Sequence, residues 1–156
     1  MKKLLTAIVV ASSFVVTATA TADTATSLKH AEKSAETRKA VYGLLGSNMG
    51  PLGAMAKGKI PFDAKAVEKY ALRINQLSLM IEDYMRTDTS GFDVPGDALK
   101  DIWEKPEAFE KRTNALVTAS ADLLAAAKLG EESAIKKAIG GVGKSCGGCH
   151  NEFRED

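Results

Sequence analysis

Three side chains able to hold a porphyrin and its iron lie together in the run Cys146-Gly147-Gly148-Cys149-His150. Cys146 and Cys149 are the only two cysteines of the chain. Two thiols three residues apart can each add to one vinyl group of the same porphyrin, and the imidazole of the next residue can bind the iron. In a helix, positions i, i+3 and i+4 share one face. The motif therefore predicts one covalently attached haem c per chain, with His150 as an axial iron ligand.

Other interpretations of these residues are possible. A structural zinc site needs about four ligands, and the only further His or Cys is His30. A redox-active dithiol normally lies in a strand–helix unit, and no strand pattern precedes this motif. Haem attachment agrees best with the sequence, and a redox dithiol or a chance match stays open.

The N-terminal residues have the three parts of a secretory signal peptide. Residues 1–3 are basic, residues 4–16 are largely apolar, and Ala20-Thr21-Ala22 is an A-x-A cleavage site. A membrane anchor would need about 20 predominantly apolar residues, and the threonines within residues 17–21 interrupt the run. We therefore expect a signal peptide at residues 1–22, cleavage after Ala22, and a periplasmic domain at residues 23–156. Export agrees with the haem motif, because this attachment takes place outside the cytoplasm.

Composition and charge limit the function classes. A mature chain of 134 residues (156 − 22) suits one domain with one core. Without Lys2 and Lys3 it carries 19 basic side chains (21 − 2) against 20 acidic ones, so no basic patch predicts nucleic-acid binding. Nothing predicts a membrane span after signal cleavage. No paired acid and base lies near the motif, and we expect a protein that is not an enzyme.

Apolar periodicity and end signals predict two helices in the first half of the domain. The first covers about residues 26–49 and is disturbed at Gly50-Pro51, and the stretch through Gly53, Gly58 and Pro61 is predicted as a loop, with one more helical turn before it as an open alternative. Asp63 is a good N-cap for the second helix. Its apolar stripe steps by three and four residues, through Val67, Tyr70, Ile74, Leu77, Ile81 and Tyr84.

Two more helices are predicted in the second half. Residues 87–96 form a loop, and Asp97 starts a short turn that brings Trp103 to the interior. Pro106 suits the first position of the third helix and Gly130 its C-cap. The fourth helix starts near the acidic residues 131–132 and runs through the haem motif, so the cofactor is expected inside the bundle.

Five glycines lie in this last helix: Gly140, Gly141, Gly143, Gly147 and Gly148. Each costs roughly 1 kcal/mol relative to alanine in a helix interior. Close packing of a flat porphyrin against the backbone would compensate for that cost. A frayed segment is the alternative.

With four helices and a C-x-x-C-H motif near its C-terminus, the chain resembles cytochrome c′, the class II c-type cytochromes. Class I cytochromes c carry the motif near the N-terminus. The resemblance covers nearly the whole mature chain and implies an all-α, antiparallel up-down-up-down four-helix bundle with the haem between the helices. It also implies a homodimer through the first two helices, where Gly43 and Gly46 leave room for close contact, and a periplasmic redox partner.

The resemblance assigns roles to residues of the first helix. Arg38-Lys39 resembles an Arg-Gln pair that contacts a haem propionate in the family, and the lysine departs from that pattern. Tyr42 lies one turn after Arg38 on the same face. It matches the position above the iron in the distal pocket, opposite His150.

Three further residues match family positions around the haem. Trp103 matches a tryptophan packed beside the cofactor, Asp97 lies near the propionates, and Arg154 follows Phe153 as a proximal-pocket residue. Two of them also have a plainer interpretation, Trp103 as a core aromatic and Arg154 as a surface charge favoured by the helix dipole.

Tyr42 decides the expected chemistry. A buried neutral tyrosine, with a solution pKa of about 10, is a poor ligand, which predicts a five-coordinate, high-spin iron that binds NO or CO or takes part in electron transfer. The alternative is a six-coordinate, low-spin iron with a methionine ligand, acting purely as an electron carrier. However, Met49, Met80 and Met85 are expected to pack in the core, and His30 on the surface.

Overall fold

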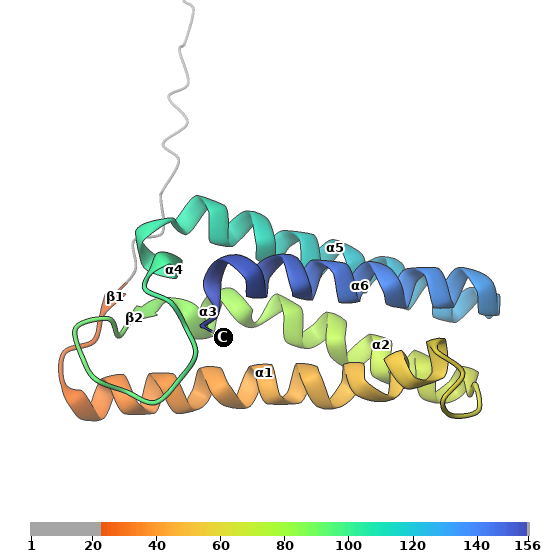
Figure 1. Cartoon of the computed structure of the whole chain (residues 1–156), viewed down its shortest axis with the longest axis horizontal. Helices are drawn as coiled ribbons and strands as arrows, with labels where there is room; N and C mark the ends of the chain where they lie inside the picture. The colour runs from red at the N-terminus through yellow and green to blue at the C-terminus, as the bar shows by residue number, and fades with distance from the viewer. Residues whose placement is uncertain (1–22, 156) are drawn as a thin grey trace, which may run out of the picture.

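Four long helices run alternately up and down in the computed structural model, which describes residues 23–155 (Figure 1). They are α1 (Leu28–Ala56), α2 (Ala64–Leu79), α5 (Pro106–Leu129) and α6 (Glu132–Phe153). Each packs on the next, and α6 returns beside α1 to close the bundle. The predicted all-α four-helix bundle is confirmed. The predicted signal peptide lies outside the described residues.

Short elements join the long helices at one end of the bundle. They are α3 (Ile81–Met85), α4 (Asp101–Glu104), and the two-residue strands β1 (Asp23–Thr24) and β2 (Thr87–Asp88). The strands pair in parallel, a contact that the sequence did not predict. No helix within residues 23–155 is long and apolar enough to span a bilayer.

The predicted helix ends are confirmed where a capping residue was identified. The Asp63 carboxylate accepts hydrogen bonds from the N–H groups of residues 65 and 66, at 2.9 and 3.1 Å. Pro106 is the first residue of α5, and Gly130 ends it with a left-handed φ of 77°. Glu131 caps α6. These contacts satisfy orphan backbone groups within a few residues of sequence, which is why they could be predicted.

The first helix does not end at Gly50-Pro51, and of the two alternatives the further helical turn agrees with the structure. α1 continues through Pro51 to Ala56. Proline removes one backbone hydrogen bond and costs roughly 3 kcal/mol in a helix interior. The extra turn places Leu52 and Met55 in the core, 0% and 3% exposed, and burying each side chain contributes roughly 2 kcal/mol. Tertiary burial therefore offsets the local cost.

The second predicted helix is interrupted at Met80. α2 ends at Leu79, where the Met80 N–H bonds to the Leu77 carbonyl, and α3 follows at a new angle. Ile81 and Met85 continue the buried stripe of α2 in steps of three and four residues, whereas Met80 and Tyr84 are 37% and 36% exposed. The expectation that Met80 packs in the core is wrong, because Met80 lies off this stripe.

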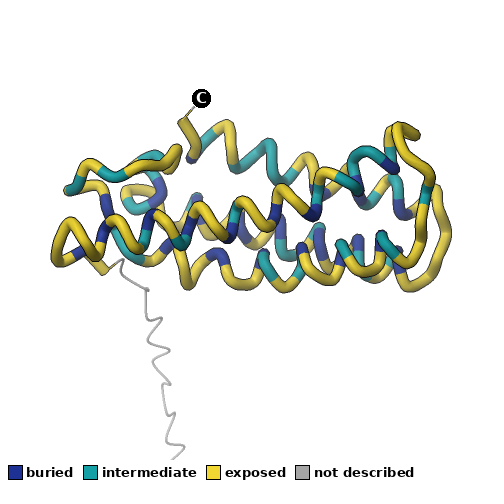
Figure 2. Tube along the Cα trace, turned by 90° about the horizontal axis from the view of Figure 1, so that it is seen from below, coloured by how far each residue is buried: buried dark blue, intermediate teal, exposed yellow. Residues whose placement is uncertain are grey.

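Buried residues lie on the inner faces of the four long helices (Figure 2). Away from the short elements, the core is closed by large side chains that are less than 2% exposed, among them Leu52, Val67, Ile74, Leu123 and Ile135. The haem motif lies at the opposite end of α6. The closed end therefore fixes the helices, and the other end is free to hold a site.

A long connection, residues 89–100, crosses this second end between β2 and α4, and we call it the strap (Figure 1). Its C-terminal part pairs with the end of α6. The Leu99 N–H donates to the Phe153 carbonyl at 3.1 Å, and the Glu155 N–H donates to the Asp97 carbonyl at 2.8 Å. The strap is thus held as one wall of the space beside the haem motif.

Candidate haem site

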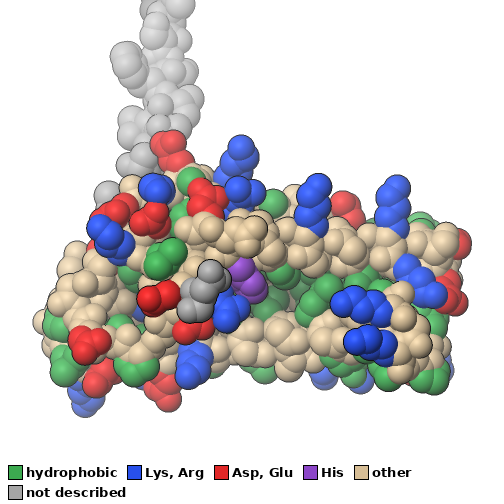
Figure 3. Space-filling model, viewed as in Figure 1, with side chains coloured by type: hydrophobic (Ala, Val, Ile, Leu, Met, Phe, Trp, Pro, Cys, Tyr) green, Lys and Arg blue, Asp and Glu red, His purple; other side chains and the backbone are tan. Residues whose placement is uncertain are grey.

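A cavity of about 590 Å³ opens between α1 and α6, beneath the strap. Figure 3 shows this face, with hydrophobic side chains in the hollow between the two helices. Its lining comes from five parts of the chain: Ala35, Arg38, Lys39, Tyr42 and Gly43 of α1; Thr89, Val94, Pro95, Gly96, Asp97 and Ala98 of the strap; Ile102 of α4; Phe109 of α5; and Cys149, His150, Phe153 and Arg154 at the end of α6.

The haem motif lies on one side of α6, as the spacing predicted. Cys149 and His150 line the cavity, and Cys146 lies one turn earlier, half-buried against the core. Ile139 and Val142 precede them on the buried stripe of the same helix. The helix is continuous through all five glycines, so a frayed segment is excluded.

The two thiols have the wrong electrostatics for a redox-active pair. Burial raises the pKa of Cys146, and burial together with the neighbouring Cys146 raises the pKa of Cys149 to about 11. Reactive cysteines have a lowered pKa, because the thiolate is the nucleophile. This microenvironment argues against the dithiol alternative.

His150 is held in the form that binds iron. Burial and the positive charge of Arg154 lower the pKa of its imidazole, which favours the neutral ring at neutral pH. His30, the other histidine, is exposed near the start of α1, where its Nδ1 lies 3.3 Å from the Thr26 N–H nitrogen. Within residues 23–155 no three His, Cys, Asp or Glu side chains gather as a metal site, so a zinc centre finds no support.

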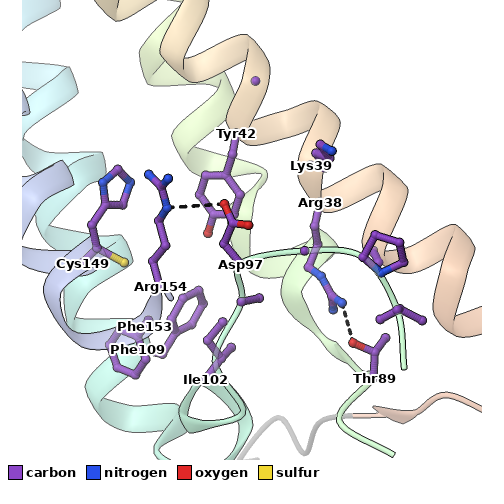
Figure 4. Close-up of a pocket in the computed structure, with 17 residues that line it drawn as sticks. Arg38, Lys39, Tyr42, Thr89, Asp97, Ile102, Phe109, Cys149, Phe153 and Arg154 are labelled. Carbon is purple, nitrogen blue, oxygen red and sulfur yellow. Dashed lines mark hydrogen bonds and ion pairs between the residues drawn. The ribbon is translucent and has the colours of Figure 1, made fainter. Parts of the chain in front are cut away.

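Tyr42 reaches from α1 into the cavity, which Cys149 faces from α6 (Figure 4). Burial, then the nearby Cys149 thiol, raise the pKa of its phenol. The hydroxyl therefore keeps its proton at neutral pH. A phenolate ligand for a metal would require the ionised form, which this environment disfavours.

Arg38 is the one charged side chain of α1 that is buried, at 5% exposure. Its Nη1 donates to the Thr87 carbonyl at 2.9 Å and its Nη2 to the Thr89 hydroxyl at 2.5 Å. Burial lowers the pKa of the guanidinium, yet an arginine stays charged in proteins. Among residues 23–155 no carboxylate lies within ion-pair distance of it. The cavity wall thus carries a buried positive charge that the Asp88 carboxylate balances only from beyond ion-pair distance.

Three of the other predicted site residues lie at the mouth of the cavity. Lys39 lines it and is exposed. Arg154 and Asp97 form an ion pair of 3.5 Å across the edge of the strap, with both side chains more than half exposed. Exposed pairs contribute little, about 0–1 kcal/mol. This pair therefore marks where the strap meets α6 without fixing it strongly.

Comparisons with known proteins agree with this geometry. The sequence model of the family described as Cytochrome C' matches residues 33–154. The chain belongs to the cytochrome c′ family. A cytochrome c' from Halomonas halodenitrificans is 38% identical over 126 residues, covering 76% of this chain and 93% of that protein.

Solved structures of cytochromes c′ have the same fold. Cytochrome c prime from Shewanella frigidimarina is 34% identical, with a TM-score of 0.75 over 81% of this chain and 97% of that one. A nitric oxide complex of a variant of the Alcaligenes xylosoxidans protein is 27% identical, with a TM-score of 0.73 over 81% and 97%. A carbon monoxide-bound variant from the same organism matches equally well.

The residues present fit the haem c of cytochromes c′. Cytochromes c′ bind this cofactor, and the two cysteines of the chain agree with its two thioether bonds. The cavity lies within the range of about 300–1,000 Å³ typical of ligand sites. Phe109 and Phe153 pack edge to face on its wall, with ring centroids 5.3 Å apart. The unpaired Arg38 guanidinium suits the carboxylates of a porphyrin.

The structure brings together most of the site residues that the resemblance suggested. Arg38, Lys39, Tyr42, Asp97 and Arg154 all line the cavity together with Cys149 and His150 of α6. Trp103 is not among its lining residues. Its ring lies against Arg38, so a direct contact with the cofactor stays a prediction.

Sequence analysis missed the residues of the strap that form the cavity wall, including Thr89, Val94 and Pro95. The strap has no periodicity from which a buried face could be predicted. The glycines next to the ligands also have neighbours that the sequence did not indicate. A methyl group at Gly148 would lie 3.4 Å from Arg112 Nη1, and one at Gly143 would lie 3.7 Å from Met49 Cε.

Proposed function

We propose that this cytochrome c′ holds one haem c through Cys146 and Cys149, with His150 as the only protein ligand of the iron. It then binds nitric oxide or carbon monoxide in the distal pocket beside Tyr42 and also serves in electron transfer. Bound haem supplies an iron that changes oxidation state by one electron and has a coordination position left for a gas. The complexes of the Alcaligenes xylosoxidans protein with these two gases support this assignment.

The observation that carries the proposal is the wall opposite His150. Tyr42 occupies it with a protonated phenol, and no methionine in the described part of the chain lines the cavity. Met49 packs beside Gly143, Met85 is 4% exposed in the core, and Met80 faces outward. These positions disfavour the alternative, a six-coordinate low-spin centre with a methionine ligand.

The ring of Tyr42 also shapes what can bind. It crowds the pocket while forming no strong bond to a metal, so a small neutral diatomic can displace it. Ile102, Phe109 and Phe153 make the remaining surroundings largely apolar. Such a pocket favours NO and CO over ligands whose bound form is strongly polar.

Electron transfer is the second candidate function. His150 is exposed and lies at the mouth of the cavity. A cofactor held there has an edge that a periplasmic redox partner can approach. This observation favours electron exchange without naming the partner.

The chain is proposed to act after export, as a binding and carrier protein without enzymatic activity. A homodimer is proposed through α1 and α2. A groove of about 400 Å³ between these helices is lined by Leu44, Tyr70, Leu77 and Met80, among others, and Leu44 is 53% exposed. Gly43, which was expected at the dimer contact, instead lines the haem cavity. The apolar residues of the groove are therefore the better candidates for the dimer contact.

Electronic spectra of the ferric and ferrous holoprotein, with and without NO or CO, test the proposal. We expect high-spin spectra without added gas and a clear change on adding either gas. His150→Ala should retain the covalent haem and change these spectra. A low-spin spectrum with a methionine-to-iron charge-transfer band in the unmodified protein would contradict the single-ligand assignment.

A further inference from the structure

Arg38 is an unusual side chain because its charge is buried while no carboxylate of residues 23–155 lies within ion-pair distance, and the Asp88 carboxylate acts on it only from farther away. The two hydrogen bonds from its guanidinium, to the Thr87 carbonyl and the Thr89 hydroxyl, go to neutral oxygens. A guanidinium has five N–H donors, so these contacts use only two of them. A buried charge of this kind is costly unless other groups compensate for its loss of water.

Trp103 supplies part of that compensation. Cζ of Arg38 lies 5.0 Å from the centroid of its ring, within the range of a cation–π interaction, which is strongest on tryptophan. The indole is itself fixed, because its Nε1 donates to the Met85 carbonyl at 2.9 Å. Trp103, which is not among the residues that line the cavity, therefore forms a rigid platform for Arg38.

The platform joins elements that are far apart in sequence. Arg38 comes from α1, Trp103 from α4, and Thr87 and Thr89 from β2 and the start of the strap. Without the ring, the guanidinium could turn away from the cavity wall and recover water. The two threonine contacts still allow the guanidinium to rotate about the line that joins them, and the ring at 5.0 Å limits that rotation.

We propose that Trp103 is a positioning residue: its ring holds the Arg38 guanidinium at the cavity wall, where the remaining N–H groups bind a carboxylate of the cofactor. Trp103 thus acts on the haem through Arg38 and not by touching it. This role rests on the proposed haem site. It replaces the expected direct contact between Trp103 and the cofactor.

The reduction potential of the holoprotein reports on this arrangement. A fixed positive charge near the haem favours the reduced form, which carries one positive charge less. Arg38→Gln should therefore lower the potential. Trp103→Leu should lower it by at least half as much, because a mobile guanidinium spends time in water, where its field is screened. Trp103→Phe keeps a ring and should give a smaller downward shift.

A double-mutant cycle separates an indirect role from a direct one. In the Arg38→Gln background, Trp103→Leu should produce no further shift of the potential, because the group that it positions is gone. Phe62→Leu is the matched control. That ring also lies under a cation, Lys136, at 6.0 Å, but it does not line the cavity, and its loss should leave the potential unchanged.

The outcomes are distinguishable. An unchanged potential in Trp103→Leu, or a full additional shift in the double variant, overturns the positioning role. An unchanged potential in Arg38→Gln overturns it too, while leaving the attachment by Cys146, Cys149 and His150 intact. If Trp103→Leu does not accumulate, Trp103→Phe serves as the same test. It should lower the reduction potential slightly in the unmodified background and should not change it in the Arg38→Gln background. Absence of covalent haem in the unmodified protein would instead refute the proposed function.

Discussion

Two helix–helix interfaces of the bundle differ in what fills them. We call the interface of α2 with α5 the closed seam and that of α1 with α6 the open seam. Between α2 and α5, Ser78 and Ser120 are 2% and 0% exposed, and their hydroxyl oxygens lie 3.1 Å apart. Asn75 Nδ2 donates to the Ser120 hydroxyl at 3.2 Å. This seam is closed by side chains that satisfy one another. Between α1 and α6, by contrast, the helices part into the cavity that holds the haem ligands.

The difference shows that similar amphipathic helices can make a closed core or an open site. Leu123 and Ile74 fill the space where α5 faces α2. In the last turns of α6 the corresponding stripe carries Cys146, Cys149 and His150, which leave the space for a cofactor. A haem bound there, as proposed, would supply the missing apolar surface, become a part of the core and stabilise the folded state.

Removing the haem should lower the stability most among these changes, and the loss should be confined to the open seam between α1 and α6. The double variant Cys146→Ser, Cys149→Ser cannot form either thioether bond. We expect its Tm to fall by on the order of 10 °C, and hydrogen exchange should become faster in the last turns of α6 and in the strap. Unchanged exchange there, or equal loss of protection in α2 and α5, would contradict the comparison.

Leu123→Ala should weaken the closed seam without touching the site. Leu123 is fully buried, and its truncation should cost about 2–5 kcal/mol in the free energy of unfolding, measured by denaturant titration. Leu129→Ala is the control, because Leu129 is 86% exposed and its loss should stay within about 0.5 kcal/mol. Gas-binding rates that change with Leu123→Ala would show that the two seams are not independent.

Tyr42→Ala should open the distal side of the open seam. We expect faster association of carbon monoxide, by about tenfold, equivalent to about 1.4 kcal/mol of barrier. Stopped-flow or flash-photolysis rates would measure it. Tyr42→Phe retains the ring and should stay close to the unmodified rate. Equal rates in all three proteins would mean that another residue covers the iron.

Asp97→Asn should have the smallest effect. It removes the ion pair with Arg154 at the edge of the strap, and the loss should be no more than about 1 kcal/mol. Glu36→Gln breaks another exposed pair, with Lys33 at 3.1 Å on α1, and controls for general charge effects. If Asp97→Asn alone changes gas-binding rates, and added salt imitates it in the unmodified protein, the strap controls access more strongly than its contacts indicate.

The sequence by itself determined the features that depend on neighbouring residues. The spacing of Cys146, Cys149 and His150 placed them on one side of a helix, and Asp63, Pro106 and Gly130 marked helix ends. Their physical basis lies within a few residues, in capping hydrogen bonds, backbone dihedral angles and helical periodicity. The positions of Arg38 and Tyr42 on the haem side of α1 came from the family resemblance.

Only the tertiary structure decided the features that depend on distant segments. α1 passes through Pro51 because Leu52 and Met55 find burial against other helices. Trp103 lies against Arg38, whereas the sequence left open whether its ring packs in the core or beside the cofactor. The strap forms a cavity wall although it has no periodic pattern. In each case the deciding free energy comes from contacts between residues far apart in the chain, which no local pattern encodes.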